Sequence, residues 1–120
     1  MGDLTKNFSR NEFSCACGCG QSLIQMQLVE ALQRARNEFG SITITSGVRC
    51  PGHNRKVGGQ QFSSHLNGWA ADLHCFHSTY RFKLVEALRR AGFSRLGIAQ
   101  SFVHVDCDPN KTPGVIWLYD

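Results

Sequence analysis

The chain has 120 residues, 42% of them hydrophobic, which suffices for one hydrophobic core and excludes a second domain. Its net charge of +4 is modest, and basic residues such as Arg34, Arg36, Arg89 and Arg90 are scattered rather than grouped with aromatic residues, so nucleic acid is not an expected partner. No segment has the apolar length of a membrane span, and residues 1–7 lack the apolar run of a secretory signal. We therefore expect a monomer that is cytoplasmic on synthesis.

Helix signals dominate the first third of the chain. The segment Phe8–Phe13 has Ser9 as an N-cap, Glu12 three residues later and a phenylalanine at each end, placed as a hydrophobic staple, so a short helix is predicted there. Apolar residues then recur at helical spacing over Ile24–Phe39, and Gly40 follows where a C-cap belongs. This pattern predicts an amphipathic helix with one face in the core.

Strand signals dominate the rest of the chain. The predicted strands cover residues 42–45, 70–75, 95–99, 102–107 and 115–119, the last as an edge strand or a docking tail. Residues 46–64 are rich in Gly and polar residues and are predicted to form a long irregular connection, and Ser78 is the predicted N-cap of a second helix that Gly92 ends. The expected fold class is α+β: a single domain over residues 1–120, with a central antiparallel sheet, flanking helices and the Cys-rich segment 1–22 packed on it.

Two short segments carry residue types that zinc prefers. Residues 63–72 (SSHLNGWAAD) contain His65 and Asp72, and residues 102–106 (FVHVD) contain His104. Two histidines and one aspartate leave a fourth tetrahedral position for water, which is typical of hydrolytic rather than structural zinc sites. For a lone His-x-Asp the alternative is a hydrogen-bonded core histidine beside a solvated acid.

The residues around these candidates favour convergence on one ion. Gly68 permits a tight backbone turn and Ala70 a close packing contact, so a ligand before the turn and a ligand on the following strand can meet. Alternation along the later strand places His104, Asp106 and Asp108 on one face. The polar side chains are therefore expected to be presented together.

Cysteines form a second group of candidate ligands: Cys15, Cys17, Cys19 and Cys50. Three or four thiolates can bind a structural zinc ion, although the CxCxC spacing differs from the usual CxxC knuckle. Small buried thiols, or a disulfide formed after release from the cell, are the alternatives. Cys75 and Cys107 are expected to pack in the core.

Four motifs, in this order along nearly the whole chain, resemble the zinc D-alanyl-D-alanine carboxypeptidase family. They are residues 8–19 (FSRNEFSCACGC), 45–54 (TSGVRCPGHN), 63–72 and 102–106. That family shares its fold with the amino-terminal signalling domain of hedgehog proteins, and the first motif is similar to its small phage and prophage members. The resemblance implies a hedgehog/D-Ala-D-Ala peptidase-like fold.

The resemblance also implies roles for individual residues. His65, Asp72 and His104 would be the zinc ligands, Arg49 would hold a substrate carboxylate or the developing oxyanion, and Ser63 would contact substrate or support a ligand. For Arg49 the alternative is a salt bridge that fixes its loop.

One position departs from the family pattern. Many members carry an acidic general base three residues before the last histidine ligand, and Ser101 stands there in this chain. Asp106 is the nearest acid in sequence, and it is predicted either to act as that base or to orient the His104 imidazole. Three other histidines are weaker candidates, since each is more often a surface or hydrogen-bonded residue: His53, His74 and His77.

The activity implied by the resemblance is zinc-dependent hydrolysis of a peptide bond next to a D-amino acid in the bacterial peptidoglycan stem. Either carboxypeptidase or endopeptidase action is compatible with the motifs, and the stem peptide is the expected partner. The protein would act on the wall after release, as a phage lysis enzyme, or as a virion component. The alternatives are a non-catalytic, zinc-stabilised binding module on the same fold and a structural cysteine–zinc protein with a vestigial cleft.

Overall fold

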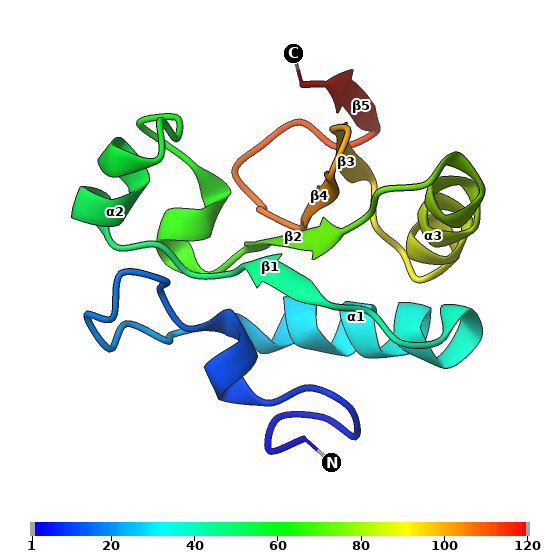
Figure 1. Ribbon diagram of the computed structural model, residues 1–120, viewed down its shortest axis with the longest axis horizontal. Coiled ribbons are helices and arrows are strands. Elements are labelled where there is room, and N and C mark those ends of the chain that lie inside the picture. Colours follow the sequence, from blue (N-terminus) through cyan, green and yellow to red (C-terminus); the bar gives the residue numbers. More distant parts are fainter. Residues whose placement is uncertain (1, 120) are drawn as a thin grey trace.

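A five-stranded sheet forms the centre of the described residues, 2–119, of this computed structural model (Figure 1). The strands are β1 (Ile44–Ser46), β2 (Ala70–His74), β3 (Arg95–Ile98), β4 (Phe102–Asp106) and β5 (Val115–Leu118). Their order across the sheet is β1-β2-β4-β3-β5. Strands β2, β4 and β3 each have a neighbour on both sides, and β2 and β4 are the most buried of them.

Three α-helices and two 3₁₀ helices occur within residues 2–119. They are α1 (Met26–Phe39), α2 (Pro51–Lys56), α3 (Ser78–Arg90), η1 (Arg10–Phe13) and η2 (Ser64–Asn67). None of the helices in this range is long and apolar enough to cross a membrane.

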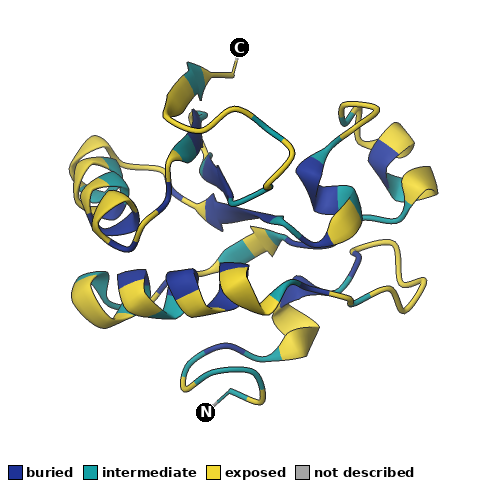
Figure 2. Ribbon diagram, turned by 180° about the vertical axis from the view of Figure 1, so that it is seen from behind, coloured by how far each residue is buried: buried dark blue, intermediate teal, exposed yellow. Residues whose placement is uncertain are grey.

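The hydrophobic core lies on one face of the sheet. Helices α1 and α3 contact each other, and their buried side chains join one cluster with Ala71 and Leu73 of β2 and with Val103 and Val105 of β4. Figure 2 shows α1 buried along the side that faces the strands and exposed on the other. Because side chains alternate along a strand, the residues between these core positions point to the opposite face.

The predicted α+β class is confirmed, with one difference in strand direction. Strands β1, β2, β4 and β3 pair antiparallel, whereas β5 runs parallel to β3. Strand β4 already has β2 and β3 as neighbours, so the chain leaving it can only add at an outer edge. A chain that reverses once after β4 runs in the same direction as β3, which is itself antiparallel to β4.

The predicted capping signals in the N-terminal segment are present. The Ser9 N–H donates to the Glu12 carboxylate at 2.6 Å, and the Phe8 and Phe13 rings lie 6.0 Å apart, both buried. Both phenylalanines belong to the core cluster, and Val48 N–H donates to the Phe13 carbonyl at 2.8 Å. The N-terminal segment therefore contacts the chain that follows β1.

Two local predictions were wrong. Residues 46–64 are not irregular throughout, because Pro51 at the first helical position starts the short helix α2 and the Cys50 sulfur accepts from the His53 N–H at 3.4 Å. Ser78 is the first residue of α3 rather than its cap: His77 occupies the N-cap position, without a side-chain capping bond. The six residues of α2 are too few for a periodic apolar pattern, so the sequence signal of this short helix is weak.

Candidate active site

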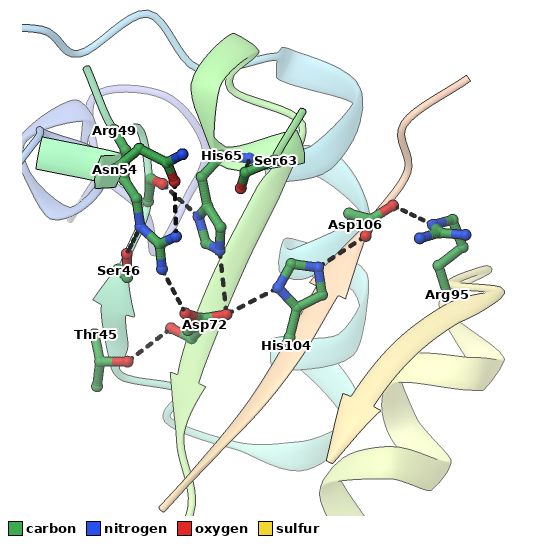
Figure 3. Close-up of polar contacts among 11 residues, drawn as sticks. Thr45, Ser46, Arg49, Asn54, Ser63, His65, Asp72, Arg95, His104 and Asp106 are labelled. Atoms are coloured by element: carbon green, nitrogen blue, oxygen red, sulfur yellow. Dashed lines mark hydrogen bonds and ion pairs between the residues drawn. The ribbon is translucent and has the colours of Figure 1, made fainter. Parts of the chain in front are cut away.

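Asp72 and His104 face each other across two central strands. They are register partners in the β2–β4 pair, on the face opposite the core, and Asp72 Oδ1 lies 3.0 Å from His104 Nδ1 (Figure 3). Each residue is only 6% exposed. Sheet pairing alone thus brings together two predicted ligands that are far apart in the sequence.

His65 reaches the same point from η2. Its Nε2 lies 3.3 Å from Asp72 Oδ1, while its Nδ1 lies 2.7 Å from the Gly47 carbonyl. That carbonyl can only accept, so Nδ1 carries a proton, and Nε2 is the nitrogen directed at Asp72. The candidate ligand atoms of His65, Asp72 and His104 all lie within 4.8 Å of one another.

The turn between η2 and β2 depends on Gly68. Its φ is +76°, in the left-handed region, and a Cβ added there would clash with the Leu23 carbonyl oxygen. The N-cap residue Ser63 accepts from the His65 N–H at 3.2 Å. This turn directs the chain from His65 into β2, as predicted from the glycine.

Asp106 lies on the far side of the His104 ring from Asp72. Its Oδ2 is 2.8 Å from His104 Nε2, and its Oδ1 accepts from Arg95 Nε at 2.7 Å. The residue is 2% exposed, and Figure 3 shows it between His104 and Arg95. With one oxygen on each neighbour, the carboxylate fixes the orientation of the imidazole.

Charges in the site reinforce one another. Burial opposes ionisation of Asp72, but hydrogen bonds to His104 and His65 outweigh it and hold the pKa of this carboxyl below its usual range. Burial likewise opposes charge on His104, whose pKa is nevertheless raised by its hydrogen bonds to Asp106 and Asp72. Two imidazoles around one carboxylate favour a cation, either a proton or a metal ion.

Arg49 is held at the edge of this group by three side chains. Its Nη2 lies 3.4 Å from Asp72 Oδ2, its Nη1 donates to Asn54 Oδ1 at 3.2 Å, and its Nε donates to Ser46 Oγ at 3.3 Å. The side chain is 15% exposed. The guanidinium is thus oriented beside the candidate metal ligands. Its ion pair with Asp72 is also a salt bridge of the kind predicted as the alternative role of Arg49.

A cavity of about 640 Å³ opens over the site. Its lining includes the metal-ligand candidates together with Arg49, Ser63 and Asp106. Ser101 lies outside this lining, in the turn between β3 and β4, and the acids that line the cavity within residues 2–119 are Asp72 and Asp106. The volume is in the range of small-molecule and short-peptide sites.

Comparison with known families agrees with this geometry. A scan against models of protein families matches residues 6–108 to Peptidase M15. The chain belongs to the Peptidase M15 family. A search of curated proteins finds no match. The resemblance to the zinc D-alanyl-D-alanine carboxypeptidases is thereby confirmed, and membership places the chain among zinc-dependent metallopeptidases.

Three residues of this M15 peptidase site were not anticipated from the sequence: Arg95, Trp117 and Tyr119. Trp117 and Tyr119 line the cavity from β5 and from the residue just after it, with ring centroids 5.4 and 6.5 Å from that of His104. The sequence signal for Trp117 and Tyr119 was their spacing of two residues on a predicted strand, which places both side chains on one face. The parallel pairing that brings them over the site comes from tertiary structure, and β5 lies beyond the residues that the family match covers.

The four predicted cysteine ligands of this M15 peptidase are also brought together. The Sγ atoms of Cys15, Cys17, Cys19 and Cys50 all lie within 4.8 Å of one another. Burial opposes ionisation of Cys15, but hydrogen bonds from the backbone N–H groups of Cys17 and Cys50 outweigh it and lower its pKa to about 7. Cys75 is buried in the core and the half-buried Cys107 packs against it, as expected.

The remaining histidines of the M15 peptidase do not join either group. His74 is exposed and its ring packs on Phe76, with centroids 4.6 Å apart, and His77 serves as the N-cap position of α3. His53 lies on α2, where its Nδ1 is buried without a hydrogen-bond partner. Their positions are consistent with the prediction that these three histidines are weaker candidates for the site.

Proposed function

We propose that this M15 peptidase hydrolyses peptide bonds next to D-amino acids in the peptidoglycan stem, as a carboxypeptidase or an endopeptidase. The observation that carries the proposal is the convergence of His65, Asp72 and His104 beneath a cavity, with Arg49 at its edge. The motifs shared with the D-alanyl-D-alanine carboxypeptidases support the substrate class.

The donor set fits zinc, because two imidazole nitrogens and one carboxylate oxygen are ligands that Zn²⁺ accepts in hydrolytic sites. His65 Nε2, His104 Nδ1 and Asp72 would hold the ion, which supplies polarisation of the scissile carbonyl and a lowered pKa for bound water. Gly47 and Asp106 each fix the opposite nitrogen of one imidazole, so both rings are oriented before any ion binds.

Arg49 is proposed to bind a substrate carboxylate. A guanidinium has a forked set of donors that matches a carboxylate, and the contacts to Asn54 and Ser46 restrict the rotation of this fork. Ser63 lies in the same lining, at the N-cap of η2, where it is available to a bound peptide. Arg49→Lys keeps the charge and loses the fork, so we expect a raised KM with a smaller change in kcat.

Asp106 is proposed to position His104 rather than to act as a general base. Both of its oxygens are engaged, one by His104 and one by Arg95. An activating base must reach a water on the metal, and this carboxylate lies on the other side of the imidazole ring.

The decisive experiment is mass spectrometry of stem peptides incubated with zinc-loaded protein and with a chelated control. A zinc-dependent fragment, absent with His65→Ala, is the expected result, and its mass identifies the bond and the mode of action. Intact peptides with protein that carries zinc at the histidine–aspartate centre would contradict the proposed activity.

The second candidate function is a zinc-stabilised binding module on the same fold. It is favoured by one observation: within residues 2–119 the acids lining the cavity are both engaged by histidines or arginines, and Ser101 replaces the usual acid. A module of this kind would bind stem peptides, measurable by calorimetry, and leave them intact.

The route to the wall is a further part of the proposal. The similarity of the first motif to phage and prophage members supports a lysis enzyme that acts after release, or a component of the virion. Detection of the protein in purified particles would separate the second route from the first.

A further inference from the structure

We propose that Cys15, Cys17, Cys19 and Cys50 bind a second zinc ion, which ties the N-terminal segment to the loop carrying Arg49. The cysteine site uses none of the residues of the histidine–aspartate centre, so the metal site does not depend on the proposed peptidase activity.

The sulfur positions match a four-coordinate site. Cys15 and Cys17 Sγ are 3.4 Å apart, Cys17 and Cys50 Sγ are 3.7 Å apart, and all four sulfurs lie within 4.8 Å of one another. Four sulfurs each about 2.3 Å from one zinc ion stand about 3.8 Å apart in a tetrahedron. A disulfide requires about 2.05 Å between the bonded sulfurs.

Two separate segments provide the sulfurs, and the first of them is a closed loop. Cys15 N–H donates to Gln21 O at 2.8 Å, which closes the loop that carries the first three cysteines, and Gly18 and Gly20 adopt positive φ in it. Cys50 comes from a segment far along the sequence, at the N-cap of α2. Three ligands from a closed loop and one from a distant element form a cross-link between them.

Backbone donors support the sulfurs from outside the cluster. The Cys50 N–H donates to Cys15 Sγ at 3.4 Å, and the His53 N–H donates to Cys50 Sγ at 3.4 Å. Hydrogen bonds of this kind orient metal ligands and stabilise thiolate charge. The exposed Cys17 and Cys19 close the cluster on its solvent side.

The cross-link ends next to the substrate-binding candidate. Cys50 follows Arg49 directly and is the N-cap of α2, and that helix carries the buried Asn54, whose Oδ1 accepts from Arg49 Nη1. Because Cys50 is next to Arg49 and caps the helix that carries Asn54, a metal that fixes Cys50 also restricts both residues of the Arg49–Asn54 contact. The metal would add a cross-link between the N-terminal segment and this loop to the hydrogen bonds from Val48 N–H to the Phe13 carbonyl and from Cys50 N–H to Cys15 Sγ.

The metal content of the intact, reduced protein tests the site directly. We expect two zinc ions per chain in the wild type, one in Cys17→Ser, one in His65→Ala and none in the double variant. Cys107→Ser is the matched control, since that half-buried cysteine lies outside the cluster, and it should keep two. Cobalt loading should give a thiolate-to-metal charge-transfer band that Cys17→Ser weakens strongly and His65→Ala leaves unchanged.

Two outcomes would overturn the cysteine site. One is a single zinc ion per chain that Cys17→Ser retains and His65→Ala loses. The other is a disulfide among the four cysteines in protein purified under reducing conditions. Because these readouts do not use activity, they separate failure of the cysteine site from failure of the proposed peptidase.

The effect on Arg49 is measured separately and rests on the proposed function. If the cross-link positions the guanidinium, Cys17→Ser should raise KM for a stem peptide several-fold with little change in kcat, while zinc at the histidine–aspartate centre is retained. An unchanged KM in a variant that has lost its second zinc ion would refute the positioning role.

Discussion

Asp106 connects the positive charge of Arg95 to the imidazole of His104. Its two short contacts, 2.7 Å to Arg95 and 2.8 Å to His104, leave neither oxygen free for another strong partner. Burial raises the pKa of this carboxyl, but the contacts with His104 and Arg95 lower it overall, so the group is charged. A charged carboxylate behind a ligand makes the imidazole a better donor toward a metal ion.

Asp106→Asn should therefore weaken zinc binding at the histidine–aspartate centre by roughly 10- to 100-fold, because the amide removes the negative charge behind His104. A competition titration with a zinc chelator measures this affinity. Asp108→Asn is the control, since Asp108 accepts from Ser64 and does not contact His104. Unchanged zinc affinity with abolished turnover would instead indicate the general-base role.

The elements that hold the site are short, and the turn between η2 and β2 is the most constrained of them. Gly68 combines a positive φ with a close approach to the Leu23 carbonyl, and the Gln25 N–H donates to the Gly68 carbonyl at 3.0 Å. The turn thus packs on the segment that leads into α1. Its position determines where η2 presents His65 to β2.

Gly68→Ala should lower the free energy of unfolding by more than the ~1–2 kcal/mol expected for a left-handed alanine alone, because the added Cβ also meets the Leu23 oxygen. Gly58→Ala is the matched control: its φ is +74° and a Cβ there meets nothing within 4 Å. Urea denaturation measures both. Equal losses for the two variants would show that the turn can relax away from Leu23.

At the scale of the whole molecule, the two faces of the sheet have different roles. The face bearing Ala71, Leu73, Val103 and Val105 packs on α1 and α3 as the core, and the other face carries the metal-ligand candidates under an open cavity. Strand β5 extends the sheet so that Trp117 and Tyr119 form part of the cavity wall. Ligand binding to the open face is therefore coupled to the stability of the strands beneath it.

Zinc should raise the stability of the folded chain in proportion to its binding. A free zinc concentration 100 times the dissociation constant of a site adds about 2.7 kcal/mol for that site, because the unfolded chain does not assemble the ligands. Thermal unfolding at increasing free zinc measures this, and His65→Ala should lose the contribution of the histidine–aspartate centre. Identical zinc responses in wild type and His65→Ala would contradict metal binding there.

Local chemistry was readable from the sequence. The cap at Ser9, the staple of Phe8 and Phe13 and the glycine turn at Gly68 depend on residue type and on spacing within a few positions. The three metal-ligand candidates were found from residue type within two short motifs. These features are decided by backbone sterics and hydrogen-bond chemistry, which act between near neighbours in the chain.

Tertiary structure decided the remainder. Which nitrogen of His104 faces Asp72, the contact of Asp106 with Arg95, the parallel direction of β5 and the meeting of Cys50 with the CxCxC loop all involve residues from different elements. Such contacts follow from how strands and helices pack to bury the core. The sequence spacing of the partners does not indicate that packing. The sequence by itself determined the chemistry of the site, and the fold determined its geometry.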